Sequence, residues 1–330
     1  MFAQTLVEIG TIAYTIVLPL LLMIGIGFVL QRALGLDMPT LTRLNFYLVV
    51  PGMVYFALVS SALAWADVGI VVGFSLLFML VLGAITLTVA AARGIPHDQR
   101  RAMLMTSIFY NAGNYGLPLQ QLAFRPVGRS DDATGMQVFV MIVQNVVSFT
   151  IGIVLASGEM RRGRWKRNLG HIFSFPPIYA LLAAVATMAV RHHLGDGDGG
   201  AAVADALTPF WDTLVYIKDG FFVIALVTLG AQLAMVSRGG LSYPVSTSVA
   251  LRLLAGPAVG LALIWLLGLD GVTAQVLLIS TATPTSVNCV LLCLQFDNHP
   301  DFVARSVFYS TVLSPITVTL VILLSRTGLV

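Results

Sequence analysis

Two stretches of this sequence combine proline with amides, hydroxyls or glycine in otherwise apolar surroundings. Residues 110–119 read YNAGNYGLPL, and residues 281–288 read TATPTSVN. Proline inside a helix removes a backbone donor and clashes with the carbonyl four residues back, and glycine and asparagine are poor helix formers. The two stretches therefore predict two interrupted helices, one unwound near Asn111–Pro118 and one unwound around Pro284.

Interrupted helices within a membrane provide the groups needed to bind a small charged solute. Non-helical backbone is tolerated there only where protein or a water-filled cavity satisfies it, and half-helix N-termini favour anions while free carbonyls favour cations or water. If the two breaks cross, they form a pocket made mainly of peptide dipoles. The alternative is that both prolines only kink packed helices, as we expect of Pro19, Pro51, Pro257 and Pro315.

Eleven residues form the predicted substrate-binding set, and most of them are neutral residues at or near the two breaks. A carboxylate held by neutral donors and helix ends can be released again, whereas an ion pair in a low dielectric would hold it too tightly for a carrier. The set consists of Asn111, Asn114, Gly116, Pro118, Gln144, Asn145, Pro284, Thr285, Ser286, Asn288 and Arg252.

Alternative roles stay open for several members of this set. Asn114 either contacts the substrate or caps the second half-helix. Gln144 and Asn145 either line the site or hold helices together. Among the polar residues that begin the second half-helix of the later break, one caps that helix and Asn288 contacts the ligand. Arg252 attracts the anion, pairs with a carbonyl or extends its side chain to the membrane surface.

The composition indicates the class of protein whose helices must position these residues. Of 330 residues, 58% are hydrophobic and only 10% are charged, whereas a soluble domain carries about 25% charged residues. This excludes a soluble enzyme, a nucleic-acid binder and a disulfide-stapled secreted domain, and it predicts an all-α membrane protein.

Ten stretches reach the length of about 20 residues that a spanning helix needs. They are Thr11–Leu30, Thr40–Leu63, Val68–Ala92, Ala102–Phe124, Ala133–Ser157, Ile172–Val190, Trp211–Met235, Val245–Leu267, Thr273–Phe296 and Phe302–Leu324.

The distribution of basic residues predicts the orientation of the spans. The loops after the odd-numbered spans carry twelve lysines and arginines, and the opposite side carries five. Under the positive-inside rule, the basic loop at residues 158–170 is cytoplasmic and both termini lie on the other side of the cell inner (plasma) membrane. Its basic residues are Arg161, Arg162, Arg164, Lys166 and Arg167.

The ten predicted spans divide into two halves of five. An odd number in each half means that the second half enters the membrane from the opposite face, so duplication would give an inverted repeat. Pro118 and Pro284 lie 166 residues apart, close to half the chain. We therefore expect a first five-helix repeat at residues 1–157, a cytoplasmic hinge at 158–170 and a second five-helix repeat at 171–330.

Four motifs resemble those of the auxin efflux carrier family of transporters. Residues 111–119 resemble its broken helix, 250–259 its arginine-plus-Gly-Pro span, 283–301 the crossover helix and His-Pro-Asp turn of plant auxin exporters, and 310–315 the final span. The resemblance implies two inverted five-helix repeats, a scaffold domain, a transport domain with crossed broken helices, and elevator-like movement of an organic anion. More distantly, the chain resembles bile acid:sodium symporters.

Departures from the plant exporters point to the bacterial branch. Leu294 and Gln295 stand where those exporters have a Lys-Glu pair, Cys289 replaces a second proline, and the central loop is short. The bacterial branch is associated with malate, malonate and similar carboxylates. The expected function is therefore secondary transport of small organic anions, namely these carboxylates or auxin-like acids. The alternative is a sodium- or proton-coupled symporter of the bile-acid-carrier type.

Other functions and partners are less consistent with the sequence. An intramembrane enzyme needs a mid-span histidine or acid pair, and neither is present. A channel would build selectivity from oligomeric rings. Cys289 and Cys293 share a helical face without a histidine or acid to complete a metal site, so we predict no metal and no cofactor. Expected partners are the organic anion and the lipid bilayer, a homodimer is left open, and nucleic acid is excluded.

Overall fold

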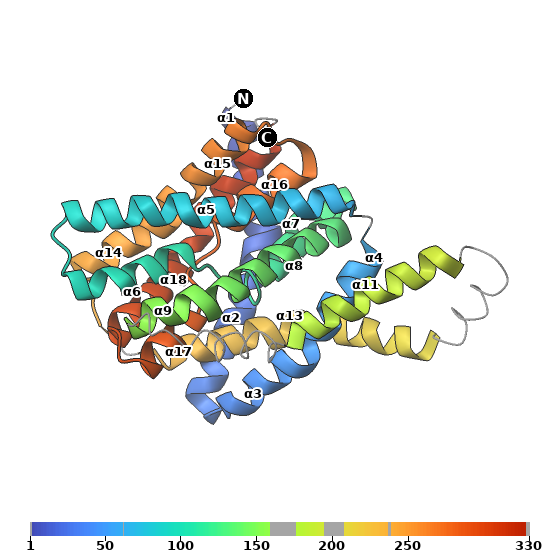
Figure 1. Cartoon of the computed structure of the whole chain (residues 1–330), viewed down its shortest axis with the longest axis horizontal. Coiled ribbons are helices and arrows are strands. Elements are labelled where there is room, and N and C mark those ends of the chain that lie inside the picture. The colour runs from blue at the N-terminus through green and yellow to red at the C-terminus, as the bar shows by residue number, and fades with distance from the viewer. Residues whose placement is uncertain (1, 62, 159–175, 195–207, 237–238, 328–330) are drawn as a thin grey trace.

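The chain folds into a helical bundle in the computed structural model, which describes residues 2–61, 63–158, 176–194, 208–236 and 239–327. Figure 1 shows the arrangement of the α-helices, and short π or 3-10 turns, written η here, join several of them. In chain order the elements are α1 (Phe2–Ile12), η1 (Ala13–Val17), α2 (Leu18–Leu34), α3 (Met38–Leu44), η2 (Asn45–Val49), α4 (Val50–Ser60), α5 (Trp65–Ala92), α6 (His97–Ile108), α7 (Gly116–Phe124), η3 (Arg125–Val127), α8 (Ser130–Val147), η4 (Ser148–Gly152), α9 (Ile153–Ser157), α11 (Pro176–Leu194), α13 (Thr208–Ala234), α14 (Tyr243–Ala250), η5 (Leu251–Ala255), α15 (Gly256–Leu267), α16 (Gly271–Thr281), α17 (Asn288–Gln295) and α18 (Pro300–Arg326).

Within the described residues, seven helical stretches are long and apolar enough to cross a membrane. They correspond to the first, second, third, fifth, seventh, eighth and tenth predicted spans, and they confirm a multi-pass all-α membrane protein. The other three predicted spans are shorter or interrupted. The described part of the sixth predicted span is the apolar stretch Pro176–Val190 of α11, and the fourth and ninth spans are each split into two short helices. Residues 159–170 of the predicted basic hinge lie outside the described residues.

Both predicted helix breaks are present, and they contact each other directly. The first half-helix α6 ends at Ile108 and α7 begins at Gly116, while α16 ends at Thr281 and α17 begins at Asn288. The two unwound segments pair through an antiparallel bridge between Tyr110 and Thr285. This pairing satisfies backbone groups that would otherwise be unbonded in the apolar interior.

The position of the first break differs slightly from the prediction. The unwound backbone covers residues 109–115, and Pro118 lies in the first turn of α7 instead of inside the break. Proline is tolerated in a first turn because the N–H groups there have no partner within the helix. The loss of helix therefore comes from the glycines and asparagines upstream, and Pro118 starts the second half-helix.

A second group of helices packs tightly beside the crossover. Helix α2 packs along α13, and α4 packs against both α11 and α13. A side chain at Gly27 would overlap the backbone of Val227, and one at Gly230 would overlap the backbone of Ile24. The backbones of α2 and α13 are therefore in direct contact, which small residues permit in membrane helices.

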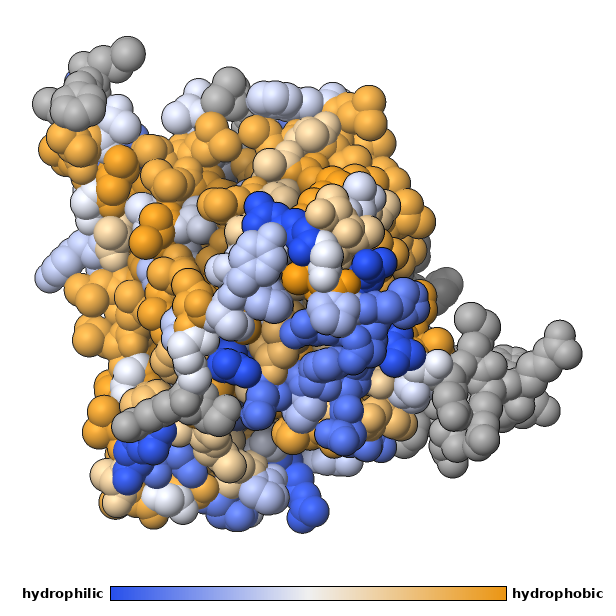
Figure 2. All heavy atoms as spheres, turned by 90° about the vertical axis from the view of Figure 1, so that its left-hand side faces the viewer, coloured by the Kyte–Doolittle hydropathy of each residue, from blue (hydrophilic) through white to orange (hydrophobic). Residues whose placement is uncertain are grey.

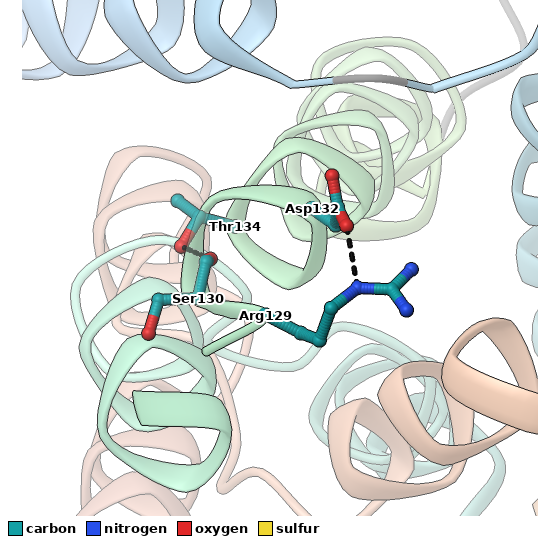
Figure 3. A network of polar contacts seen from close by, with 4 residues as sticks. All are labelled: Arg129, Ser130, Asp132 and Thr134. Atoms are coloured by element: carbon teal, nitrogen blue, oxygen red, sulfur yellow. Dashed lines mark hydrogen bonds and ion pairs between the residues drawn. The ribbon is translucent and has the colours of Figure 1, made fainter. Parts of the chain in front are cut away.

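Local hydrogen bonds fix the start of two helices that reach the crossover. Asp37 caps α3 by accepting a hydrogen bond of 3.1 Å from the backbone N–H of Thr40. Hydrogen bonds from the Thr40 hydroxyl and backbone N–H lower the pKa of Asp37. At the start of α8, Arg129 Nε lies 2.7 Å from Asp132 Oδ2, and the Thr134 hydroxyl donates to the Ser130 carbonyl (Figure 3).

The surface carries a polar face set among apolar side chains. Figure 2 shows hydrophilic side chains gathered on the face that lies to the left in Figure 1, with hydrophobic ones around them. The connection between α5 and α6 lies on that side and exposes Arg93, His97 and Asp98. Asp98 Oδ2 lies 3.1 Å from His299 Nε2, which joins this connection to the start of α18. A polar face bounded by apolar surface is what a membrane-embedded protein presents to water.

Candidate functional site

A small cavity lies where the two breaks cross. It has a volume of about 60 Å³, room for a few water molecules or one small acid. Its wall comes from the two unwound segments, from α8 and η4, from α3, η2 and α4, and from α13. None of the described residues that line it is charged. Six of the eleven predicted substrate-binding residues line this cavity, namely Asn111, Asn114, Gln144, Asn145, Ser286 and Asn288.

Asn111 has its backbone fixed and its side chain unpaired. Its N–H donates to the Pro284 carbonyl at 2.8 Å, and its carbonyl accepts from the Gly116 N–H at 2.9 Å. The residue is only 7% exposed and lines the cavity, and none of the hydrogen bonds found among the described residues involves its side chain. Its amide is not among the fully buried polar atoms, so it faces the cavity and can hydrogen-bond to what occupies it.

Asn114 binds a neighbouring helix and does not cap α7. Its Oδ1 accepts a hydrogen bond of 3.0 Å from Asn45 Nδ2. The residue before α7 is Tyr115, which makes no side-chain capping bond. The structure therefore does not support the capping alternative for Asn114, because Tyr115 stands at the N-cap and the Asn114 oxygen bonds to Asn45 on η2. Asn114 lines the cavity and connects the first break to the second predicted span.

The polar residues of α8 and α17 meet across the cavity. Asn288 Nδ2 donates to Asn145 Oδ1 at 3.2 Å. Gln144 Oε1 accepts from the Tyr110 N–H at 3.4 Å, so it supports the backbone beyond the end of α6. Ser286 Oγ accepts from the Asn288 N–H at 3.3 Å. The residue before α17 is Val287, and no side-chain capping bond is made there, so capping by one of the polar residues of the second break stays a prediction.

Pro284 and Thr285 hold the crossing together without lining the cavity. The Pro284 carbonyl accepts from Asn111, as described above. The Thr285 hydroxyl donates to the Thr106 carbonyl at 2.8 Å, and its N–H donates to Ser310 Oγ at 3.1 Å. Thr285 therefore ties the second break both to α6 and to α18. Their direct contact with a substrate stays a prediction.

Gly116 makes room for a buried polar network behind the first break. Gln137 Nε2 donates to the Ala112 carbonyl at 2.9 Å, and a side chain at Gly116 would overlap that same nitrogen. Gln120 Nε2 donates to the Val276 carbonyl at 2.9 Å and lies 3.2 Å from Ser280 Oγ. These side chains are buried and link α7, α8 and α16. Gly116 and Pro118 therefore lie outside the cavity wall and shape it through packing.

Arg252 is fully buried and does not extend to the membrane surface, so that alternative is wrong. One guanidinium nitrogen donates to the Ser107 carbonyl at 2.7 Å and the other donates to the Thr281 carbonyl. These carbonyls belong to the last turns of α6 and α16, where the helix dipoles present partial negative charge. The Arg252 guanidinium therefore bonds to the C-termini of two helices and does not reach the water at the membrane surface.

The surroundings of Arg252 complete this arrangement. Its guanidinium lies 4.9 Å from the ring centroid of Tyr110 and 5.5 Å from that of Phe78, which favours a buried cation. A side chain at Gly256 would come within 2.7 Å of an Arg252 nitrogen, so this glycine leaves the space that the guanidinium occupies. Arg252 does not line the cavity, but the Tyr110 ring beneath it belongs to a residue that does.

The sequence prediction missed the wall of the cavity opposite the crossover. Four residues that line the cavity each carry a buried oxygen with no hydrogen-bond partner among the described residues: Asn45 Oδ1, Ser148 Oγ, Thr228 Oγ1 and Gln232 Oε1. Thr228 and Gln232 lie four residues apart on α13, so they share one helix face. That spacing of two polar residues in an apolar span was the available signal, and Thr42 with Asn45 shows a similar one.

The neutral amides and hydroxyls that line this cavity can bind an anion by hydrogen bonds without forming an ion pair. A second half-helix, α17, begins in the cavity wall at Asn288, so its positive dipole end points to the same space. The arrangement suits reversible binding.

Comparison with known proteins agrees with a transport role. Residues 164–322 match the family described as membrane transport protein. The chain is also 20% identical over 309 residues to an uncharacterized transporter of Methanothermobacter thermautotrophicus, a match that covers 92% of this chain and 95% of that protein. Both findings confirm the resemblance seen in the motifs. They indicate a transporter and not an enzyme, as the sequence predicted. The chain is a membrane transporter, and its second half is similar to the membrane transport protein family.

Proposed function

We propose that this transporter carries small organic anions across the cell membrane and binds them at the crossover of its two broken helices. The candidate substrates are carboxylates such as malate and malonate, or auxin-like acids. The observation that carries the proposal is the side-chain amide of Asn111, which has no hydrogen-bond partner among the described residues and faces a cavity whose described lining residues are uncharged. A carboxylate oxygen would accept the hydrogen bond that this amide lacks.

The position of Arg252 supports binding that is reversible. Its charge lies behind Tyr110 and is already bonded to two carbonyls, so it makes the cavity more favourable for an anion without contacting it. Coulomb attraction falls with distance and rises steeply in a low dielectric. A direct ion pair would hold the substrate tightly, whereas a charge one ring away adds attraction and still permits release.

We further propose an elevator-like mechanism in a ten-helix, inverted-repeat fold. The repeats would be residues 1–157 and 171–330, joined by the hinge at 158–170. The scaffold would contain the closely packed α2, α4, α11 and α13, and the transport unit would contain the crossover. The cavity supports this division, because α13 and η2 form one wall and the broken helices form the other. Movement of one wall against the other would open the bound anion first to one side of the membrane and then to the other.

The membrane potential gives a direction to this transport. An inside-negative potential favours anion export by about 2.3 kcal/mol per charge per 100 mV, so export needs no coupled ion. We place the protein in the plasma membrane, with the hinge in the cytoplasm and both termini on the other side.

The second candidate is coupling to sodium or protons. It is favoured by the oxygens of the lining residues Asn45, Ser148 and Thr228, which have no hydrogen-bond partner in the part of the chain that the structure describes, because oxygen atoms are the ligands that small hard cations prefer. Measuring transport with and without imposed sodium and proton gradients separates the two candidates. Uncoupled export predicts the same rate in every gradient when the membrane potential is clamped.

The test of the proposed function is counterflow of labelled malonate and malate in proteoliposomes. We expect saturable exchange by the wild type and its loss in Asn111→Ala. The matched control is Asn298→Ala, because the Asn298 amide donates to the Leu155 carbonyl and lies outside the cavity. Equal counterflow by Asn111→Ala and the wild type would remove Asn111 from the site. Single-channel current steps would contradict a carrier altogether.

A further inference from the structure

A second cavity lies away from the crossover and is lined by two arginines. Its volume is about 390 Å³, and it lies between the end of α2, the end of α13, the residues before α14 and the second and third turns of α18. Arg32 and Arg305 contribute its charges, and Phe28, Phe308 and Tyr309 contribute aromatic rings. Within the part of the chain that the structure describes, neither arginine forms an ion pair with a carboxylate.

The two arginines are held in place by their own elements. The Arg32 guanidinium lies 5.6 Å from the ring centroid of Phe28, and Arg305 Nε donates to the Asp301 carbonyl at 3.1 Å. A side chain at Gly239 would come within 2.7 Å of Arg305, so the glycine leaves room for that side chain. The Tyr309 hydroxyl donates to the Gly239 carbonyl at 3.0 Å and fixes the loop against α18.

We propose that this cavity binds the phosphate of an anionic phospholipid between Arg32 and Arg305. Guanidinium groups match the geometry of phosphate oxygens and keep their charge at all physiological pH values. The aromatic and aliphatic lining suits the glycerol and upper acyl region of an amphiphile better than a free ion. Basic pockets between membrane helices on the cytoplasmic side bind such headgroups, and the positive-inside rule places both arginines on that side.

The site is distinct from the crossover cavity, and its occupancy does not depend on the proposed substrate. Arg32 lies on α2 and Arg305 lies on α18, which packs against α14, α16 and the α1–η1 part of the first span. A bound headgroup would therefore connect the end of α2 with the start of α18.

The test measures lipid binding to the purified, delipidated full chain by native mass spectrometry. The probes are phosphatidylglycerol, phosphatidylcholine and inorganic phosphate. We expect retained phosphatidylglycerol, little phosphatidylcholine, and a decrease of about fivefold in phosphatidylglycerol affinity for each of Arg32→Gln and Arg305→Gln. Arg43→Gln is the matched control, because Arg43 is exposed on α3, lies on the same predicted side and does not line the cavity.

Three outcomes would overturn the proposal. An equal loss of phosphatidylglycerol in the Arg43 control would show unspecific attraction to positive charge. Unchanged affinity in both Arg32→Gln and Arg305→Gln would show that the lipid binds elsewhere. Thermal stabilisation by inorganic phosphate that matches phosphatidylglycerol and disappears in the same two variants would assign the site to a soluble anion.

Discussion

Arg252 offers the sharpest prediction about how the crossover is held. We expect Arg252→Met to leave two buried carbonyls without donors, those of Ser107 and Thr281. Each unpaired buried acceptor costs about 1–3 kcal/mol, so the two together cost about 2–6 kcal/mol. The variant also avoids burying a cation without a carboxylate partner, which recovers part of that cost. We expect a net loss of roughly 2 kcal/mol in unfolding free energy.

Arg252→Lys separates charge from geometry. Lysine keeps the positive charge, but a single ammonium lacks the planar fork that reaches both carbonyls. We therefore expect its stability to lie between those of the wild type and Arg252→Met. Substrate affinity should fall in both variants, because the half-helix ends that position Asn111 lose their common donor.

The assay is denaturant unfolding of the detergent-solubilised protein, combined with the KM of counterflow. The matched control is Arg326→Met. Arg326 also donates to a helix-terminal carbonyl, that of Ala123 at 3.1 Å, but it is exposed at the end of α18. We expect that control to lose under about 1 kcal/mol. If Arg252→Met unfolds at the same denaturant concentration as the wild type and keeps its KM, the assigned role of Arg252 is wrong.

Three further substitutions test the packing and the cavity wall. Gly27→Ala would place a methyl group against the α13 backbone and should lower the unfolding free energy by about 1–3 kcal/mol or more. Gly25→Ala on the same helix meets nothing within 4 Å, so it should be neutral in the same unfolding assay. Gly116→Ala should push Gln137 from its carbonyl partner and lower both stability and counterflow, and counterflow at the wild-type rate would contradict this. Thr228→Val removes an unpaired hydroxyl, so we expect unchanged or slightly higher stability together with a raised KM, and an unchanged KM would exclude that wall from the site.

The helix breaks were predictable because their cause is local. Proline, glycine and asparagine lower helix stability wherever they occur. The residue types in 110–119 and 281–288 were therefore enough to predict that each helix is interrupted there. The meeting of the two breaks depended on a non-local pairing between Tyr110 and Thr285, which the sequence supported only through their matching positions in the two halves.

The role of Arg252 and the far wall of the cavity depended on contacts between distant residues. Arg252 binds carbonyls, and every residue has a carbonyl, so no residue type marks its partners. Thr228 and Gln232 are separated from Asn111 by more than a hundred residues and differ little from other polar residues in apolar helices. Their importance follows only from the packing of α13 beside the crossover.

The most direct test of the crossover site is the binding of small carboxylates to the purified protein, measured as a shift in unfolding temperature. A ligand present at 100 times its Kd stabilises the folded state by about 2.7 kcal/mol. We predict that malonate or malate raises the unfolding temperature of the wild type and of Asn298→Ala, and leaves that of Asn111→Ala unchanged. An equal rise in all three proteins would contradict a carboxylate site at the crossed helices.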